Sequence, residues 1–306
     1  MTGQQITAGG ITVELTHHGK TFYPDDGITK GDVVEYYHQA AGRMLPYLKD
    51  RPVNMARYPD GITGPRIFQK NVPDYFPDWI TRVTVPKQGG TLQQAVCDKP
   101  ATVVYLANQG CIELHIFLSR TGRLDRPDQL VVDFDPPSAD DFGVARQGAL
   151  WLRALLADEM DVTSFVKTTG GKGLHVHVPL DRGAGFDEVR VLATDLAGVL
   201  AARHPDALTI EQRKNGRGGR VYLDVMRNAY AQSVVAPYAV RARPGAAVAT
   251  PLHWDEVGDD KLEPGVFNLR TMAGRLDDSD DPWAGLTRRR YGLPGLRRRL
   301  DQASQS

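Results

Sequence analysis

The stretch Val131-Val132-Asp133-Phe134-Asp135-Pro136-Pro137 decides how the rest of the chain is interpreted. Successive strand side chains point to opposite faces, so Asp133 and Asp135 share a face, roughly 6.5–7 Å apart at their Cα atoms. The two prolines cannot extend a central ladder, so the strand is expected to end there. Two carboxylates this close suit a divalent metal ion, because alone they repel each other. Alternatively, Asp133 caps a turn and Asp135 is a surface residue, and this stretch alone does not decide between them.

Composition excludes several classes of protein. The chain has 306 residues, 41% of them hydrophobic, which is enough for one large domain or two lobes. It has 37 basic and 37 acidic residues, so a nucleic-acid surface can come only from local segregation of charge. Two cysteines, Cys97 and Cys111, exclude a disulfide scaffold and a cysteine-based zinc cluster. Without a signal segment or a membrane-length apolar run, we expect a cytoplasmic, nucleoid-associated protein with no membrane partner.

An amphipathic helix is predicted from residue 29 to about residue 49. Thr29 and Asp32 have the spacing of a capping box, with Asp32 in place of the usual glutamate, and apolar residues follow at helical spacing. Lys30 then lies in the first turn, where unpaired N–H groups favour an anion, and Lys20 lies shortly before it. Two lysines around a helix start could hold a phosphate, although each by itself is more often a solvated lysine.

Residues 51–120 are predicted to form strands and loops. Basic and aromatic types are interleaved in this segment at Arg57, Arg66, Phe68 and Lys70. Such interleaving is typical where bases stack and phosphates pass, but a half-buried strand with Phe68 in the core explains it equally well. His115 lies in an apolar run, where a lone histidine is more often a structural residue.

A glycine-rich turn follows the acidic strand, between helices predicted over 143–160 and 186–204. The turn, Thr168-Thr169-Gly170-Gly171-Lys172-Gly173, joins two strands. Its glycines allow backbone N–H groups to approach an anion and its lysine adds a positive charge, which predicts a phosphate cradle. It is not a P-loop, because it opens into a strand rather than a helix. His175 and His177 share one face of the second strand; they could ligate a metal, but one phosphate contact and one structural histidine are favoured.

A third carboxylate follows a basic loop at 212–220. In the strand Val221-Tyr222-Leu223-Asp224-Val225, Asp224 lies on the face opposite the three aliphatic residues. Carboxylates that bridge two metal ions can stabilise both the attacking and the leaving oxygen of a phosphoryl transfer. The surrounding cations would neutralise a polyphosphate leaving group, which favours nucleotidyl transfer without excluding a nuclease.

Three motifs in this order resemble those of a known superfamily. They are Asp133-Phe134-Asp135-Pro136, Thr169-Gly170-Gly171-Lys172-Gly173-Leu174-His175 and Arg220-Val221-Tyr222-Leu223-Asp224. The chain resembles the archaeo-eukaryotic primases and, more closely, the polymerase domain of the bacterial end-joining ligase LigD and its stand-alone relatives. The resemblance implies an α+β fold with one domain over 1–300. An N-terminal lobe at 1–125 would recognise the DNA 5′-phosphate. The catalytic core at 126–290 would have a mixed or antiparallel sheet flanked by helices, and a basic tail would follow at 291–306.

The same resemblance implies roles for individual residues. Asp133, Asp135 and Asp224 would be catalytic and would bind two ions of Mn²⁺ or Mg²⁺. The incoming NTP or dNTP would be bound by Arg57, Phe68, His115, Thr169, Lys172, His175, Arg217 and Arg241, with Phe68 stacking on a base. Lys20 and Lys30 would hold the 5′-phosphate of a DNA break or gap.

We therefore expect a stand-alone primase-polymerase that acts in non-homologous end joining or gap filling. A primer 3′-hydroxyl would attack the α-phosphate of a nucleotide and release pyrophosphate. No ligase or nuclease domain is recognised, so Ku and a separate DNA ligase are candidate partners. The alternatives are a metal-dependent phosphodiesterase or nuclease that uses the same carboxylates, and a non-catalytic module that binds DNA ends.

Overall fold

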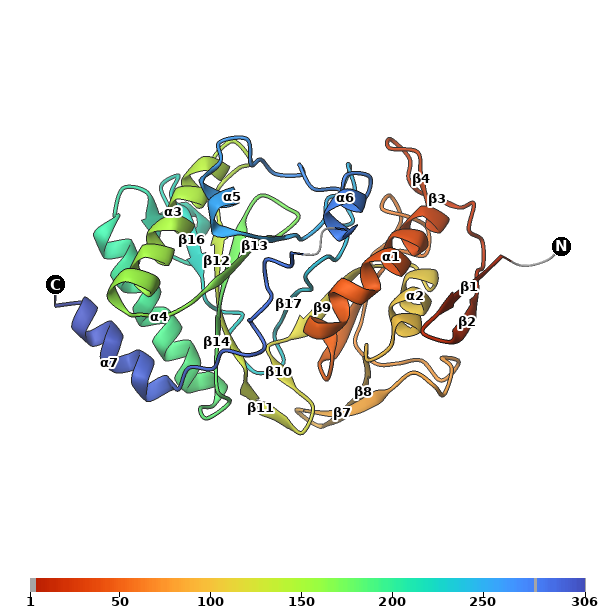
Figure 1. The fold of residues 1–306 in the computed structure, drawn as a ribbon, viewed down its shortest axis with the longest axis horizontal. Coiled ribbons are helices and arrows are strands. Elements are labelled where there is room, and N and C mark those ends of the chain that lie inside the picture. Colours follow the sequence, from red (N-terminus) through yellow and green to blue (C-terminus); the bar gives the residue numbers. More distant parts are fainter. Residues whose placement is uncertain (1–3, 278–279, 306) are drawn as a thin grey trace. The chain divides into compact units, whose positions relative to one another are not determined.

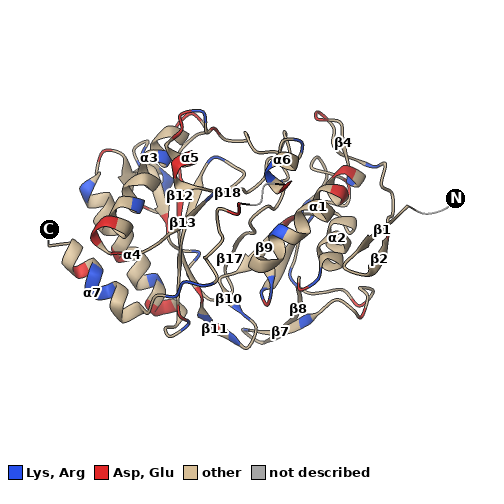
Figure 2. Ribbon diagram, viewed as in Figure 1, with Lys and Arg blue, Asp and Glu red and all other residues tan. Residues whose placement is uncertain are grey.

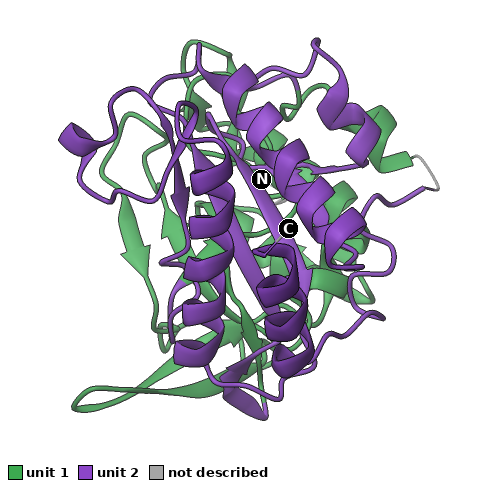
Figure 3. Ribbon diagram, turned by 90° about the vertical axis from the view of Figure 1, so that its left-hand side faces the viewer, with its two compact units in different colours: residues 1–121, 233–249, 267–279 green, residues 122–232, 250–266, 280–306 purple. Residues whose placement is uncertain are grey.

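Figure 1 shows the computed structural model of the chain, which describes residues 4–277 and 280–305. Two compact units, each assembled from three segments, are coloured separately in Figure 3. Unit 1 comprises Met1–Thr121, Ser233–Ala249 and Phe267–Ser279, and unit 2 comprises Gly122–Gln232, Thr250–Val266 and Asp280–Ser306. The first boundary lies near the expected division at 125/126. The return of two later segments to unit 1 was not predicted, because it depends on strand pairing over long sequence separations.

Unit 1 is built on an antiparallel sheet. Across the sheet, its strands are β17 (Ser233–Val235), β9 (Cys111–Phe117), β5 (Pro52–Arg57), β8 (Gly90–Val96) and β7 (Arg82–Lys87), and β6 (Ile67–Gln69) pairs with β5. Two small hairpins precede it: β1 (Gln5–Ala8) with β2 (Ile11–Glu14), and β3 (Thr21–Tyr23) with β4 (Ile28–Thr29). In β9, Glu113 and His115 lie opposite Ala56 and Asn54 of β5. This register places their side chains on one face of the sheet.

Helix α1 (Lys30–Leu48) of unit 1 begins at the predicted capping box. The Thr29 hydroxyl accepts a hydrogen bond from the Asp32 N–H, and the Asp32 carboxylate accepts one from the Thr29 N–H at 2.7 Å. These reciprocal bonds satisfy N–H groups that have no partner within the helix. The predicted start and end of this helix are therefore confirmed. A short helix, α6 (Met272–Asp277), also belongs to unit 1.

Helix α2 (Pro100–Asn108) was not predicted, and the expectation that 51–120 contains only strands and loops was wrong. Seven of its nine residues are buried, and it packs against α1. A helix buried on nearly all sides has no polar face, so its sequence lacks the 3.6-residue periodicity that identifies a surface helix. The β-branched residues at 102–104 add to the resemblance to a strand.

Unit 2 contains the mixed sheet that carries the acidic stretch. Across the sheet, its strands are β15 (Leu208–Thr209), β16 (Val221–Asp224), β12 (Gln129–Asp135), β14 (Leu174–Pro179), β13 (Phe165–Thr168) and β18 (Pro251–Leu252). The β15–β16 pair is parallel and the other pairs are antiparallel, which confirms the expected α+β class with a mixed sheet. The short strands β10 (Ser119–Arg120) and β11 (Arg123–Pro127) lie at the junction of the units in the sequence.

Three helices of unit 2 cover one face of this sheet. The buried apolar side chains between these helices and the sheet form the core of the unit. The three helices are α3 (Phe142–Ala154), which continues as a π-helical turn over Leu155–Glu159, α4 (Phe186–Arg203) and α7 (Leu293–Ala303); a further short helix is α5 (Trp254–Gly258). Side chains of the helices surround Leu130 and Val178 of the sheet, and α3 approaches Phe134 at Gly148. Because residues alternate along β12, Asp133 and Asp135 point to the other face.

The expected basic tail at 291–306 is mostly the helix α7. Its Leu296 and Leu300 are buried in unit 2, while Arg297 forms an ion pair with Asp195 of α4 at 2.6 Å. The arginines therefore lie on the outer face of an amphipathic helix, where Figure 2 shows a group of basic residues. Residue 306 lies outside the described residues. Within the described part of the chain, no helix has both the length and the apolar character needed to cross a membrane.

Candidate functional site

The three predicted metal ligands come together in unit 2. Asp133 of β12 lies directly opposite Asp224 of β16 on one side and His175 of β14 on the other. Asp135 lies two residues further along β12, on the same face. Directly opposed residues of an antiparallel pair have Cβ atoms about 4.5–5.5 Å apart. We call Asp133, Asp135 and Asp224 the acidic row; it lies on the face of the sheet that α3, α4 and α7 leave uncovered.

Cationic side chains surround the acidic row. Asp135 forms an ion pair with Lys172 at 3.1 Å and another with Arg217 at 3.3 Å. The imidazole Nε2 of His175 lies 3.3 Å from Asp133. The Arg217 guanidinium also lies over the ring of Tyr222, 4.0 Å from its centroid. The positive charges of Lys172 and Arg217 offset the repulsion between the carboxylates, and such groups are of the kind that binds phosphate.

The electrostatics of Asp224 indicate that the acidic row suits a cation. Burial, together with the charges of Asp133 and Asp135, raises the pKa of Asp224, although the N–H of Met226 donates to it at 2.8 Å and acts in the opposite direction. A divalent ion bound by carboxylate oxygens would lower that pKa, and oxygen ligands suit Mg²⁺ and Mn²⁺. Among the residues that the structure describes, no three acidic, histidine or cysteine side chains already converge as a metal cage. The donor set fits such an ion, but Asp135 is at present engaged with Lys172 and Arg217.

The glycine-rich turn is closed by its own threonine. The Thr169 hydroxyl donates to the carbonyl of Gly173 at 3.1 Å and accepts from the N–H groups of Gly171 and Gly173. Two N–H groups that were expected to face a phosphate thus have a partner inside the turn. A Cβ at Gly173 would lie 2.2 Å from the carbonyl oxygen of Phe134, so only glycine allows β14 to begin this close to β12. Lys172 donates to the carbonyls of Pro136 and Pro137, which joins the turn to the end of the acidic strand.

The two histidines of β14 have different surroundings. His175 lies beside the acidic row, whereas His177 is buried with its Nδ1 2.7 Å from Gln129 and its ring against Trp283. The geometry therefore agrees with one structural histidine rather than a histidine pair that binds a metal.

Sequence reasoning missed Glu113, which organises the predicted ligands of unit 1. This buried carboxylate accepts from Arg241 Nε at 2.9 Å and from the N–H of Ala242, and it lies 3.2 Å from His115 Nε2. Burial alone would raise the pKa of Glu113, but its bonds with His115 and Arg241 hold that pKa well below its usual range. Glu113 and His115 alternate with an apolar residue, as Asp133 and Asp135 do, and this pattern was the available signal.

Phe68 is not in the core. It is 42% exposed, and the Arg66 guanidinium lies 4.9 Å from the centre of its ring. Its other ring contact is an edge-to-face arrangement with His115, at 5.8 Å between centroids. The interpretation of Phe68 as a half-buried core residue was therefore wrong, and its ring is accessible to a stacking partner.

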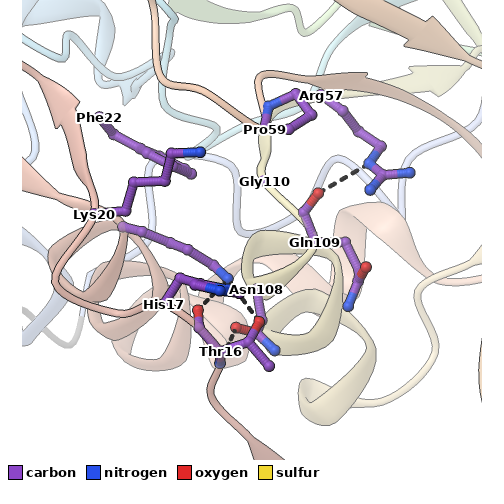
Figure 4. Close-up of a pocket in the computed structure, with 10 residues that line it drawn as sticks. Thr16, His17, Lys20, Phe22, Arg57, Pro59, Asn108, Gln109 and Gly110 are labelled. Carbon is purple, nitrogen blue, oxygen red and sulfur yellow. Dashed lines mark hydrogen bonds between the residues drawn. The ribbon is translucent and has the colours of Figure 1, made fainter.

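Lys20, Lys30 and Arg57 line one pocket of unit 1, with a volume of about 290 Å³ (Figure 4). Lys30 is buried and donates to the backbone carbonyl and hydroxyl of Thr16, while Lys20 pairs with Asp60. Burial, assisted by the charge of Lys20, lowers the pKa of Lys30 to about 8. An anion in this pocket would compensate both lysines. Arg57, which was predicted as a nucleotide ligand, lies in the wall of this pocket.

A mixed sheet with an acidic row, a lysine-containing turn and flanking arginines defines a nucleotidyltransferase-type site, in which carboxylates suit metal ions and cations suit phosphates. The family described as LigD, primase-polymerase domain, matches residues 29–283, and the chain belongs to this family. Membership confirms the predicted resemblance and the predicted enzyme class, a nucleotidyltransferase of the primase-polymerase type.

Individual relatives agree with this assignment. The chain is 33% identical over 272 residues to the bifunctional non-homologous end joining protein LigD of Bacillus subtilis. This match covers 89% of this chain and 43% of that protein. The chain is also 32% identical over 295 residues to the multifunctional LigD of Pseudomonas aeruginosa. This match covers 96% of this chain and 34% of that protein. The chain thus spans less than half the length of these relatives. The polymerase domain of Mycobacterium tuberculosis ligase D, solved in complex with DNA, has a TM-score of 0.83 and 30% identity, over 90% of this chain and 97% of that one.

Proposed function

We propose that this chain extends a primer strand at a DNA break or gap by metal-dependent, template-directed nucleotidyl transfer. The observation that carries the proposal is the acidic row, whose three carboxylates lie on paired strands beside Lys172, His175 and Arg217. The similarity to a polymerase domain solved with DNA supports it.

In this proposal the acidic row holds two ions of Mn²⁺ or Mg²⁺. Bound there, such ions would activate the primer 3′-hydroxyl and neutralise the leaving pyrophosphate. Lys172 and Arg217, which pair with Asp135, exchange this partner for the phosphates of an incoming NTP or dNTP. Thr169 keeps the glycine-rich turn in shape, and His175 orients Asp133.

Unit 1 supplies further ligands. Arg241 and His115, held in place by Glu113, bind the triphosphate, and the exposed ring of Phe68 stacks on a base. The pocket of Lys20 and Lys30 binds the 5′-phosphate at the far side of a gap. In this proposal the metal ligands belong to unit 2, and the pocket for the DNA 5′-phosphate belongs to unit 1.

We also propose the wider setting, a cytoplasmic repair reaction at the nucleoid. Three of the four ligands assigned to the triphosphate, Lys172, Arg217 and Arg241, are lysine or arginine, which favours a nucleoside triphosphate over simple hydrolysis of a phosphodiester. The enzyme would leave a nick, so a DNA ligase must act after it, and Ku is a candidate for holding the ends together.

The test is a primer on a gapped template with a downstream 5′-phosphate, incubated with Mn²⁺ or Mg²⁺ and each NTP or dNTP. We expect the wild-type protein to extend the primer, and Asp133→Asn and Asp224→Asn to bind the same DNA without extending it. Asp206→Asn, at an exposed loop position, is the matched control and should extend normally. Primer shortening without extension would support a nuclease, and DNA binding by the wild-type protein without extension or shortening would support a module that only binds DNA ends. Extension by Asp133→Asn at the wild-type rate would overturn the assignment of Asp133 as a metal ligand.

A further inference from the structure

Tyr75 is the most exposed of the large hydrophobic and aromatic side chains that the structure describes, at 62%. It lies in the loop between β6 and β7 of unit 1. The ring is nevertheless held in position: its hydroxyl accepts a hydrogen bond from Arg57 Nη1 at 3.0 Å, and it makes an edge-to-face contact with the buried ring of Phe76 at 5.2 Å. An exposed but immobilised aromatic ring loses little conformational entropy when a partner stacks on it.

The partner of Tyr75, Arg57, is itself fixed in place. Its Nε donates to the carbonyl of Gln109 at 2.9 Å, and its Nη1 also donates to the Gln69 side chain at 2.7 Å. Figure 4 shows the first of these bonds, with Arg57 at the wall of the pocket that Lys20 and Lys30 also line. The Arg57 guanidinium therefore contacts the Tyr75 hydroxyl and also lines the pocket of Lys20 and Lys30.

The chemistry around Tyr75 selects a kind of ligand. Arg57 Nη1 lies 3.0 Å from the Tyr75 hydroxyl, and the Arg66 guanidinium lies 4.9 Å from the centre of a second exposed ring, that of Phe68. Exposed aromatic rings interleaved with cations suit a single-stranded nucleic acid, because every base has a face that stacks and every link carries a negative charge.

We propose that Tyr75 is a stacking platform for the first unpaired template base beside a downstream 5′-phosphate bound in the pocket. This inference rests on the proposed function, because it assigns the DNA feature that the pocket reads together with the phosphate. The base stacks on the ring of Tyr75, and Arg57 neutralises the backbone phosphate next to it. The site thereby distinguishes a gap, which has an unpaired template base, from a nick, which has none.

The experiment compares two DNA substrates with identical 5′-phosphates, one with a short gap and one with only a nick, by fluorescence anisotropy. We expect Tyr75→Ala to weaken binding to the gap about tenfold, since stacking contributes about 1–3 kcal/mol per base, and to leave binding to the nick unchanged. Tyr75→Phe keeps the ring and should stay within about twofold of wild type. Val191→Ala, at another exposed position in unit 2, should change neither affinity.

A second measurement places the contact. A 2-aminopurine at the first unpaired template position should be quenched by wild-type protein and by Tyr75→Phe, but not by Tyr75→Ala. Equal losses on gap and nick, or unchanged quenching in Tyr75→Ala, would overturn the proposal. If the wild-type protein extends primers and Tyr75→Ala binds gaps normally, only this inference fails. If the wild-type protein neither extends primers nor prefers 5′-phosphorylated DNA, the proposed function fails as well.

Discussion

Replacing Glu113 with glutamine tests whether this buried carboxylate positions the triphosphate ligands of unit 1. The substitution keeps the size of the side chain but removes its charge. It also puts an NH₂ group where one carboxylate oxygen now faces a donor, Arg241 Nε at 2.9 Å or His115 Nε2 at 3.2 Å. Arg241 and His115 should therefore lose their present orientation while the surrounding strand pairing remains.

The expected magnitude follows from the bonds that are weakened. A hydrogen bond to a charged group contributes about 1.5–3 kcal/mol, and one between neutral groups about 0.5–1.5 kcal/mol. Losing the charge at Glu113 therefore costs about 1 kcal/mol for each of its two side-chain partners, Arg241 and His115. Since each 1.4 kcal/mol is a factor of ten, the KM for the nucleotide should rise about 30-fold. The effect should appear mainly in KM, because Glu113 is not part of the acidic row.

Steady-state extension of a primer on a 5′-phosphorylated gap measures kcat and KM separately. An NMR titration of His115 provides a readout that a general loss of stability would not move. Burial lowers the pKa of His115 while Glu113 raises it, so that pKa should fall further in Glu113→Gln. Glu35→Gln, on the exposed side of α1, is the matched control.

The reasoning is refuted if Glu113→Gln unfolds at the wild-type temperature, leaves the titration of His115 unchanged and has an unchanged KM. A fall in kcat with no change in KM would instead show that Glu113 acts on the chemical step.

Three further predictions concern the pocket of unit 1 and the strand that carries the acidic row. Asp60→Asn frees Lys20 from an exposed ion pair that contributes about 0–1 kcal/mol, so preference for 5′-phosphorylated over unphosphorylated gaps should rise up to about fivefold; a lower preference would contradict this. Because the pKa of Lys30 is lowered to about 8, that preference should fall between pH 7 and pH 9, and Lys30→Arg should flatten the profile; an equally steep profile in the arginine variant would exclude Lys30 as the titrating group. The buried Asn228 amide bonds both the N–H and the carbonyl of Val131, so Asn228→Ala should lower the free energy of unfolding by about 3 kcal/mol in urea titration, and a loss below about 1 kcal/mol would show that water replaces the amide.

Local sequence patterns were sufficient wherever a residue's role depends on its near neighbours. The shared face of Asp133 and Asp135 follows from the two-residue period of a strand, and the start of α1 follows from Thr29 and Asp32 three residues apart. The motifs of the family are also short and contiguous. For these reasons the fold class, the family and the shared face of Asp133 and Asp135 were predicted correctly.

Other features could not be predicted from local patterns because they depend on partners distant in the sequence. Asp133 meets Asp224 only through the register of β12 against β16, and Glu113 meets Arg241 across 128 residues. Helix α2 is buried on nearly all sides, so no periodicity marked it. Arg57 lies in the wall of the Lys20 pocket through the end of β5 and its bond to Gln109.

By itself, then, the sequence determined which side chains have the chemistry for nucleotidyl transfer and which face of each strand or helix carries them. Only the tertiary structure decided which of those faces meet, because register and the pairing of buried charges are set by contacts between distant segments. The stretch at Asp133 and Asp135 shows both parts: its alternation was visible in seven residues, whereas its partners Asp224, His175, Lys172 and Arg217 were brought to it by the fold.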